Sequence, residues 1–269
     1  MSGSVIHSQS AAMVPAEYSA GQPASLPVAI DYPAALALRQ MSMVHDELPK
    51  YLLAPEVSAL LHYVPDLRRK MLLATLWNTG ARINEALALT RGDFSLAPPY
   101  PFVQLATLKQ RTEKAARTAG RTPAGQQTHR LVPLSDSWYV SQLQTMVATL
   151  KIPMERRNKR TGRTEKARIW EVTDRTVRTW IGEAVAAAAA DGVTFSVPVT
   201  PHTFRHSYAM HMLYAGIPLK VLQSLMGHKS ISSTEVYTKV FALDVAARHR
   251  VQFSMPESDA VTMLKNRHA

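Results

Sequence analysis

Four residues whose types suit chemistry on phosphate lie close together in the C-terminal half of the sequence. They are His202, Arg205, His228 and Tyr237, which fall within about 40 residues of one another. Arginine binds phosphate oxygens, histidine moves or donates protons, and a tyrosine hydroxyl can act as a nucleophile. The grouping therefore indicates phosphoryl-transfer chemistry.

The first pair of these residues is expected on one helix. Thr200 is a good N-cap residue and Pro201 suits the first helical position, so His202 lies in the opening turn. Arg205 follows one turn later on the same face. Because the N-terminus of a helix also favours anions, this segment is well placed to receive a phosphate.

Cleavage of a phosphodiester requires a nucleophile, neutralisation of the non-bridging oxygens and a proton for the leaving oxygen. An arginine fork binds two phosphate oxygens at once and stays protonated, so two arginines can clamp the group. Arg82 and Arg205 are the candidates for this pair. Tyr237 is the candidate nucleophile, because a phenolate is a good leaving group and its ester can be reversed.

Each residue taken alone has a simpler interpretation. Most tyrosines on helices are packing residues, and most helical arginines lie on the surface. His206 follows His202 by four residues, a spacing found in zinc sites, but Thr203 stands where such a motif has glutamate. A metal site is therefore the least favoured account, and only the joint occurrence of the residues supports catalysis.

Composition limits the class of protein. The chain has 269 residues, no cysteine, 31 Lys and Arg against 20 Asp and Glu, and a pI near 10.0. Such a positive charge favours nucleic acid as the partner. No apolar run is long enough to span a membrane, and the start lacks the positive charge of a secretion signal. We expect a cytoplasmic protein with no membrane partner.

The elements that must position these residues are mostly helices. Apolar periodicity and capping residues predict helices from Ala54 to about Tyr63, Asp66 to Asn78, Arg82 to Leu89, Ser137 to Leu150, Asp174 to Ala190, Pro201 onward, Pro218 to Met226 and Ser232 onward. Alternating residues at Phe102–Lys109 and a short, branched, apolar run at Arg130–Leu134 predict two paired strands. The predicted fold is mainly α with a small antiparallel β-sheet.

Three segments have little to bury. Residues 1–47 are rich in Ser, Ala and Pro at the start and are expected to form a mobile head, with a short helix at Ala34–Met43. Arg111 to Arg130 and Lys151 to Arg168 are rich in basic residues. Either basic segment is a solvated surface or a contact with phosphates.

With these residues in place, the chain resembles the tyrosine recombinase family, which includes phage integrases and Xer-type enzymes. Thr79–Leu87 resembles the first box of the family and His202–His206 the second. Leu225–His228 and Tyr237 follow in the family order. The match covers about Leu48 to Val251.

The resemblance implies a role for each matching residue. Arg82 and Arg205 correspond to the two catalytic arginines, His202 and His228 to the two histidines, and Tyr237 to the nucleophile. Glu85 corresponds to a bracing acid, and His206 is expected to orient its neighbours. The family also has a lysine that protonates the leaving 5′ oxygen; Lys109 corresponds to it, with Lys114 as the alternative. No cofactor or metal is implied.

The resemblance also implies an organisation and partners. Residues 48–250 correspond to the catalytic domain, and 251–269 to a tail that docks on a neighbouring protomer. Relatives usually carry an N-terminal helical domain that closes around DNA, for which the first 47 residues are too short. Partners are double-stranded DNA at a specific site, a homo-tetramer on that DNA, and possible accessory DNA-binding proteins.

The expected function is site-specific recombination through a covalent phosphotyrosine. Among small relatives the chain resembles recombinases that resolve plasmid multimers, including resolvases of F-type plasmids, and fimbrial-switch recombinases share the short plan. A topoisomerase-like enzyme that nicks and reseals, an inversion or integration recombinase, and a non-catalytic DNA-binding relative remain alternatives.

Overall fold

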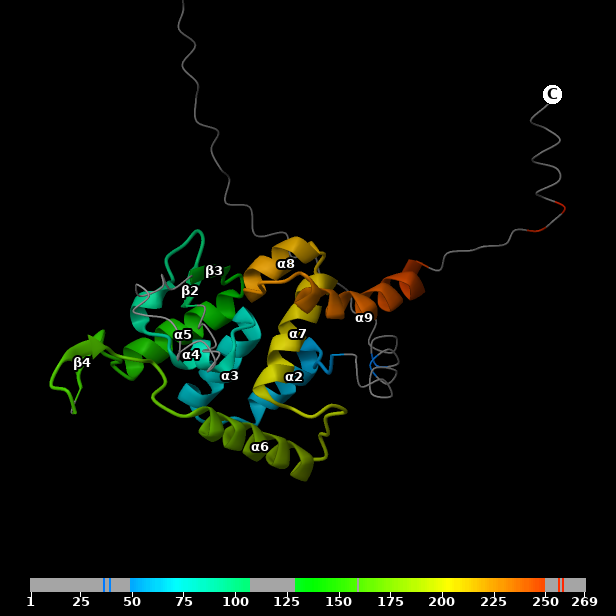
Figure 1. The fold of residues 1–269 in the computed structure, drawn as a ribbon. Coiled ribbons are helices and arrows are strands. Elements are labelled where there is room, and N and C mark those ends of the chain that lie inside the picture. The colour runs from blue at the N-terminus through cyan, green and yellow to red at the C-terminus, as the bar shows by residue number, and fades with distance from the viewer. Residues whose placement is uncertain are drawn as a thin grey trace, which may run out of the picture.

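The structure of the chain is a computed structural model that describes residues 49–106, 129–158 and 160–249, together with Leu36, Arg39, Pro256 and Ser258 (Figure 1). The expected head, the helix at 34–43 and the C-terminal tail therefore lie outside the described residues, apart from these four. The proposed limits of the three domains are not tested by the structure.

Helices dominate the described part of the chain (Figure 1). They are α2 (Ala54–His62), α3 (Leu67–Thr79), α4 (Ile83–Leu87), α5 (Ser137–Thr149), α6 (Asp174–Ala190), α7 (Pro201–Tyr214), α8 (Leu219–Met226) and α9 (Ser232–His249), with a 3₁₀ turn at Arg91–Asp93. The prediction of a mainly helical fold with a small antiparallel sheet is confirmed. Within the described ranges, no helix combines the length and the apolar character that crossing a membrane requires.

Capping residues explain where the helices begin and end. Asp66 caps α3 by accepting a hydrogen bond from the backbone N–H of Arg69 at 2.8 Å, and Gly80 ends it in the left-handed conformation with φ of 59°. Thr200 caps α7 as predicted. Thr173 is the N-cap of α6, and its hydroxyl accepts a hydrogen bond from the backbone N–H of Thr176 at 3.2 Å.

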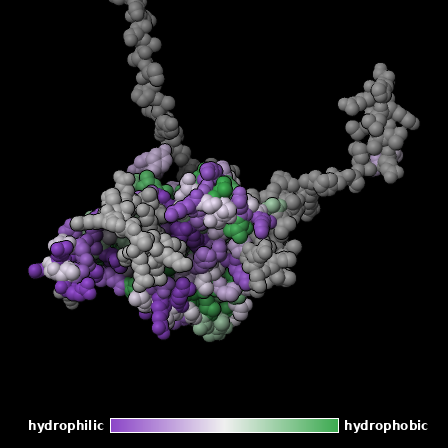
Figure 2. Space-filling model, viewed as in Figure 1, coloured by the Kyte–Doolittle hydropathy of each residue, from purple (hydrophilic) through white to green (hydrophobic). Residues whose placement is uncertain are grey.

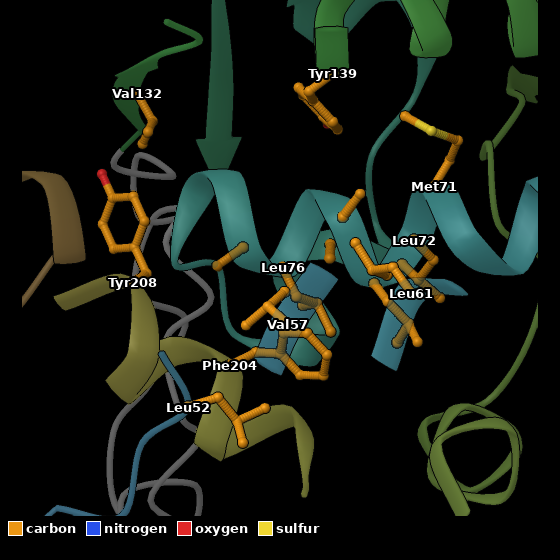
Figure 3. Close-up of a cluster of buried hydrophobic side chains, with 14 of the residues drawn as sticks. Leu52, Val57, Leu61, Met71, Leu72, Leu76, Val132, Tyr139, Phe204 and Tyr208 are labelled. Carbon is orange, nitrogen blue, oxygen red and sulfur yellow. The ribbon is translucent and has the colours of Figure 1, made fainter. Parts of the chain in front are cut away.

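The hydrophobic core is centred on α3, which packs against α7 and α5. Figure 3 shows Leu76 of α3 beside Phe204 of α7 and Val57 of α2, and all three side chains are at most 1% exposed. Burying side chains of this size stabilises a fold by about 1.5–3 kcal/mol each. Because Phe204 precedes Arg205, this packing fixes the part of α7 that carries Arg205.

A three-stranded antiparallel sheet covers one end of the core. Its order is β1 (Phe94–Ser95), β2 (Phe102–Ala106) and β3 (His129–Pro133), with Val103 paired to Val132. Val103 and Val132 are buried while their neighbours are more exposed, and in β2 this burial follows the alternation that predicted the strand. The two residues of β1 are too few to give a periodic signal.

A second antiparallel pair was not predicted. β4 (Glu155–Arg157) and β5 (Thr164–Lys166) form a separate hairpin that projects from the body (Figure 1). The sequence indicated an exposed basic segment here, and the hairpin residues are indeed largely exposed. Its base is anchored, however, by buried Ile152 and Ala167 and by a β-bridge between Thr90 and Arg168.

Candidate active site

Five of the six predicted site residues come together in one pocket. Its volume is about 600 Å³, and it is bounded by α4, the first half of α6, α7, the turn between α8 and α9, and the first turns of α9. The residues that line it include Arg82, Glu85, Arg178, His202, Arg205, His206, His228, Ser233 and Tyr237. Lys109 and its alternative Lys114 lie outside the described residues.

Arg82 is held at the start of α4 by a tight turn. Gly80 has φ of 59°, and a Cβ at this position would lie 2.3 Å from the Tyr208 ring, so only glycine fits. The backbone N–H of Arg82 donates to Glu85 Oε2 at 2.9 Å, and its guanidinium NH1 donates to Oε1 at 3.0 Å. The side chain is 42% exposed, so the rest of its fork remains available to a ligand.

Arg205 is the most deeply buried cation of the pocket, at 3% exposed. Its guanidinium donates to the carbonyl oxygen of Gly80 and, at 2.6 Å, to that of Met226. Burial, and secondarily the charge of Arg82, lower the pKa of Arg205 to about 10. Arg205 is therefore still protonated at neutral pH, and its position is fixed before any substrate binds.

His202 and His206 stand one turn apart on α7, with ring centroids 4.3 Å apart in an edge-to-face arrangement. Burial is the main cause that lowers the pKa of His202, and the charge of Arg205 adds to it. His206 Nδ1 lies 3.0 Å from the Tyr237 hydroxyl. The prediction that His206 orients a neighbour now has a specific partner.

Tyr237 lies on α9 and is 2% exposed. Burial raises the pKa of its hydroxyl to about 12, although the charges of Arg205 and Arg82 oppose this shift. Burial is also the main cause that lowers the pKa of His206 to about 4. So weak a base does not by itself deprotonate so weak an acid, and their contact orients the phenol.

His228 follows the αL residue Gly227, which ends α8 with φ of 64°. Its Nδ1 is 2.8 Å from the Thr234 hydroxyl, and its backbone N–H donates to the Gln223 carbonyl at 3.1 Å. Burial, followed by the charges of nearby arginines, lowers the pKa of His228 to about 4. Thr234, in the first turn of α9, thus holds the His228 ring.

The charges around the pocket favour an anion. Burial acts to raise the pKa of Glu85, but hydrogen bonding and charge from Arg130, with help from Arg82, outweigh it and lower that pKa. Glu85 is therefore ionised at neutral pH. The described lining residues include three arginines, Arg82, Arg178 and Arg205, but only this one carboxylate. A phosphate group would balance the excess positive charge.

Two arginines of this region were missed or misinterpreted in the sequence. Arg178 lines the pocket from α6, and its spacing to Asp174 predicts only a surface ion pair, which it also forms at 3.4 Å. Arg130 was placed at the end of an exposed basic segment, and that prediction is wrong for this residue. It is 9% exposed and ion-paired to Glu85, whereas 111–128 lie outside the described residues.

Comparisons with known proteins agree with this geometry. A model of the phage integrase family matches residues 50–243. The chain is 97% identical over 265 residues to a resolvase of Escherichia coli strain K12, covering 98% of this chain and 99% of that protein. It is 46% identical to a probable site-specific recombinase in the afa region of Escherichia coli, covering 94% of this chain and 96% of the relative.

Solved structures show the same fold at low identity. The Tn1549 transposon integrase in complex with a circular intermediate DNA superposes with a TM-score of 0.54 at 19% identity. That match covers 82% of this chain and 66% of the other. At this identity the likeness establishes the arrangement of helices and sheet.

Proposed function

The chain belongs to the phage integrase family and is a site-specific recombinase, and from this premise we propose that it cuts and rejoins DNA through a phosphotyrosine at Tyr237. One observation carries the proposal. Tyr237, Arg82, Arg205 and His228 line a single positively charged pocket that is open enough to admit a backbone phosphate.

In the proposed first step, the Tyr237 oxygen attacks the phosphorus of the scissile phosphodiester. A P–O bond to tyrosine forms, the P–O5′ bond breaks, and the phenolic proton is lost as the 5′ oxygen gains one. The 5′ hydroxyl of another strand then attacks the phosphotyrosine and releases Tyr237. Because each step exchanges one phosphate ester for another, the reaction requires no ATP.

Arg82 and Arg205 are proposed to bind the non-bridging oxygens. A phosphodiester carries one negative charge and its five-coordinate transition state carries two, so fixed cations bind the transition state more strongly than the substrate. Arg205 suits this role because its carbonyl contacts leave it little freedom to reorganise. Arg82 suits it because its side chain lines the pocket and is 42% exposed.

The histidines and a lysine complete the proposal. His228 Nδ1 lies 2.8 Å from the Thr234 hydroxyl, and we assign Nδ1 as the acceptor of that hydroxyl. The His228 proton is then on Nε2, which can donate to a phosphate oxygen. His202 is proposed to assist from α7. Lys109, with Lys114 as the alternative, is the proposed donor to the 5′ oxygen.

Double-stranded DNA is the proposed partner, because the chain is strongly basic and its structural relative, the Tn1549 integrase, is solved with DNA. The name of the K12 relative, a resolvase, favours resolution of plasmid multimers over inversion or integration. We also propose a homo-tetramer on the DNA, possible accessory DNA-binding proteins, no membrane partner and a cytoplasmic location.

The domain limits are part of the same proposal. Residues 48–250 act as the catalytic domain, 1–47 form a head, and 251–269 dock on a neighbouring protomer. Deletion of 252–269 is expected to weaken assembly of paired sites in gel-shift experiments while leaving cleavage of one site intact. Unchanged assembly would contradict the docking role.

The β4–β5 hairpin is proposed to contact the DNA backbone. Arg157, Arg160 and Arg163 are exposed on it, and Figure 2 shows this projection as largely hydrophilic. Arg156 is already engaged, in ion pairs with Glu165 and Glu171. Contacts of this kind add affinity without reading sequence.

A recombination assay tests the central proposal. The substrate is a supercoiled plasmid with two directly repeated copies of the DNA that flanks the coding region of this chain. We expect the parent to produce two circles and Tyr237→Phe to produce none, since phenylalanine has no nucleophilic oxygen. Tyr208→Phe, which keeps a ring packed against Gly80, is the matched control and should remain active.

The same assay separates the alternatives. Relaxed plasmid without exchanged strands would indicate a topoisomerase-like enzyme, and binding without covalent complex would indicate a non-catalytic relative. Recombination by Tyr237→Phe at the parental rate would refute the assignment.

A further inference from the structure

Arg130 does not line the pocket, but it contacts two of the elements that bound the pocket. It lies on β3, is 9% exposed, and reaches both α4 and the end of α8, which are 45 and 95 residues away in sequence. We propose that Arg130 is a positioning residue that sets Arg82 on one side and His228 on the other. The inference rests on the proposed function.

The first contact of Arg130 is a fork onto Glu85. NH2 donates to Oε2 at 2.6 Å and NH1 to Oε1 at 3.2 Å. Glu85 also accepts two hydrogen bonds from Arg82, so one buried carboxylate is shared between two guanidinium groups. Without Arg130, the negative charge of Glu85 would be paired with Arg82 alone. Arg82 would then attract a phosphate less strongly, because more of its positive charge would be neutralised by Glu85.

The second contact of Arg130 is with the end of α8. Its Nε donates to the Leu225 carbonyl at 2.8 Å, while Arg205 donates to the next carbonyl, that of Met226, at 2.6 Å. The last carbonyls of a helix lack intrahelical partners and carry partial negative charge. Two arginines therefore hold the turn from which His228 projects.

Gly227 shows how closely Arg130 fits this turn. A Cβ on Gly227 would lie 2.9 Å from Arg130 NH1 and 3.1 Å from Cδ, so the glycine backbone rests directly on the arginine. Figure 1 shows β3 beside α8, in agreement with this contact. A single side chain thus joins strand β3, the acid of α4 and the turn after α8.

Lysine cannot reproduce this arrangement. Arg130 uses three nitrogens on two different elements, with a planar fork that matches a carboxylate and a third donor pointing elsewhere. An ammonium group is a compact point charge and would hold Glu85 or Leu225, but not both. Arg130→Lys therefore retains the charge and loses the geometry.

The competing explanation is that Arg130 only stabilises the fold, since breaking a buried ion pair is generally destabilising. A substrate in which a methyl group replaces one non-bridging oxygen of the scissile phosphate separates the two explanations. This methylphosphonate is neutral and needs less help from Arg82. A loss that acts through Arg82 shrinks on the neutral substrate, whereas a loss from partial unfolding is equal on both.

The experiment measures the rate of covalent complex formation at saturating DNA, on suicide substrates with a phosphodiester or a methylphosphonate. Variants are Arg130→Met, Arg130→Lys, and Arg130→Met with Glu85→Gln, which leaves no unpaired buried charge and so protects folding. Arg69→Met is the control, because Arg69 also pairs with a carboxylate, Glu183, away from the pocket. Thermal unfolding is followed for each variant.

We expect Arg130→Met and Arg130→Lys to cleave the phosphodiester on the order of 10 to 100-fold more slowly, with near-parental DNA affinity. The loss should be several-fold smaller on the methylphosphonate. The double variant should recover stability but not rate, and Arg69→Met should match the parent. Folded Arg130 variants with parental rates, or equal losses on both substrates, would overturn the inference. Absence of covalent complex in the parent would instead refute the proposed function.

Discussion

Arginines gather in two regions of this molecule, the pocket and the β4–β5 hairpin, and the two regions differ in how far the arginines are buried and bonded. At the pocket, Arg205, which lines it, and Arg130, which contacts its α4 wall, are buried and bonded to backbone carbonyls or to Glu85. On the hairpin, Arg157, Arg160 and Arg163 are exposed.

The difference indicates what each region contributes to the proposed reaction. A buried cation with fixed partners does not reorganise when charge develops on a phosphate, so it accelerates chemistry. An exposed cation is mobile and screened over about 8–10 Å by physiological salt, so it contributes affinity that salt removes. Arginines of the pocket should therefore change rates, and those of the hairpin should change salt dependence.

The largest effect is expected at Arg205. Arg205→Lys keeps a positive charge but cannot bond both the Gly80 and Met226 carbonyls and still reach a phosphate. We expect cleavage at saturating DNA to fall roughly 100 to 1,000-fold, as when a preorganised donor is removed from an active site. Single-turnover formation of covalent complex measures it. A loss seen only in DNA affinity would place Arg205 with the hairpin arginines.

Gly227→Ala tests whether the turn beside Arg130 must be glycine. The αL conformation costs an L-residue roughly 1–2 kcal/mol, and the new Cβ would also displace the Arg130 guanidinium. We expect lower thermal stability together with slower cleavage. The control is Gly182→Ala in α6, where a Cβ meets no atom within 4 Å and helix propensity favours alanine by about 0.5–1 kcal/mol. Equal effects at both glycines would contradict the account.

The histidines of the pocket predict how stability depends on pH. The pKa values of His206 and His228 are lowered to about 4 from an ordinary value of 6.5, mainly by burial. Between these values the unfolded chain binds more protons than the folded one. Their contribution is therefore complete above pH 6.5 and is lost as pH falls toward 4.

Thermal unfolding measured between pH 4.5 and 7.5 tests the predicted direction of this change in stability. The melting temperature of the free protein should fall as the pH decreases from 6.5 to 4.5. His228→Asn should flatten the dependence, because asparagine does not titrate. A melting temperature that rises as the pH falls would show that these rings are protonated in the folded state.

The smallest effect on chemistry is expected at the hairpin. Replacing Arg157, Arg160 and Arg163 with glutamine should reduce the slope of log affinity against log salt by about 0.9 for each phosphate that the variant no longer neutralises. Cleavage at saturating DNA should not change. Arg156→Gln is the matched control, because its guanidinium is engaged by Glu165 and Glu171. An unchanged slope in the triple variant would exclude the hairpin from the DNA interface.

Five of the six predicted site residues line one pocket, and the sequence signals that singled them out are local. The cap at Thr200, the spacing of His202 and Arg205, and the stops at Gly80 and Gly227 can all be recognised within a few residues. Together with the family resemblance, they predicted which side chains meet. They did not predict the Tyr237–His206 hydrogen bond, which depends on how α9 packs on α7.

The missed features depend on partners that are distant or on very short elements. Arg130 follows a basic stretch in sequence, and only the approach of α4 and α8 turns it into a buried residue. Strands β4 and β5 span three residues each, so alternation is not detectable. The ion pair of Arg156 with Glu165 reinforces their pairing. Counting the charged residues of this segment in the sequence indicates only an exposed basic surface.

The central claim is that the Tyr237 hydroxyl becomes joined to DNA. The direct test is to trap the covalent complex on a suicide substrate, digest it with trypsin, and identify the DNA-linked peptide by mass spectrometry. The account predicts the peptide of residues 230–239, whose one tyrosine is Tyr237. A phosphodiester linkage on any other peptide, or an undiminished adduct from Tyr237→Phe, would contradict it.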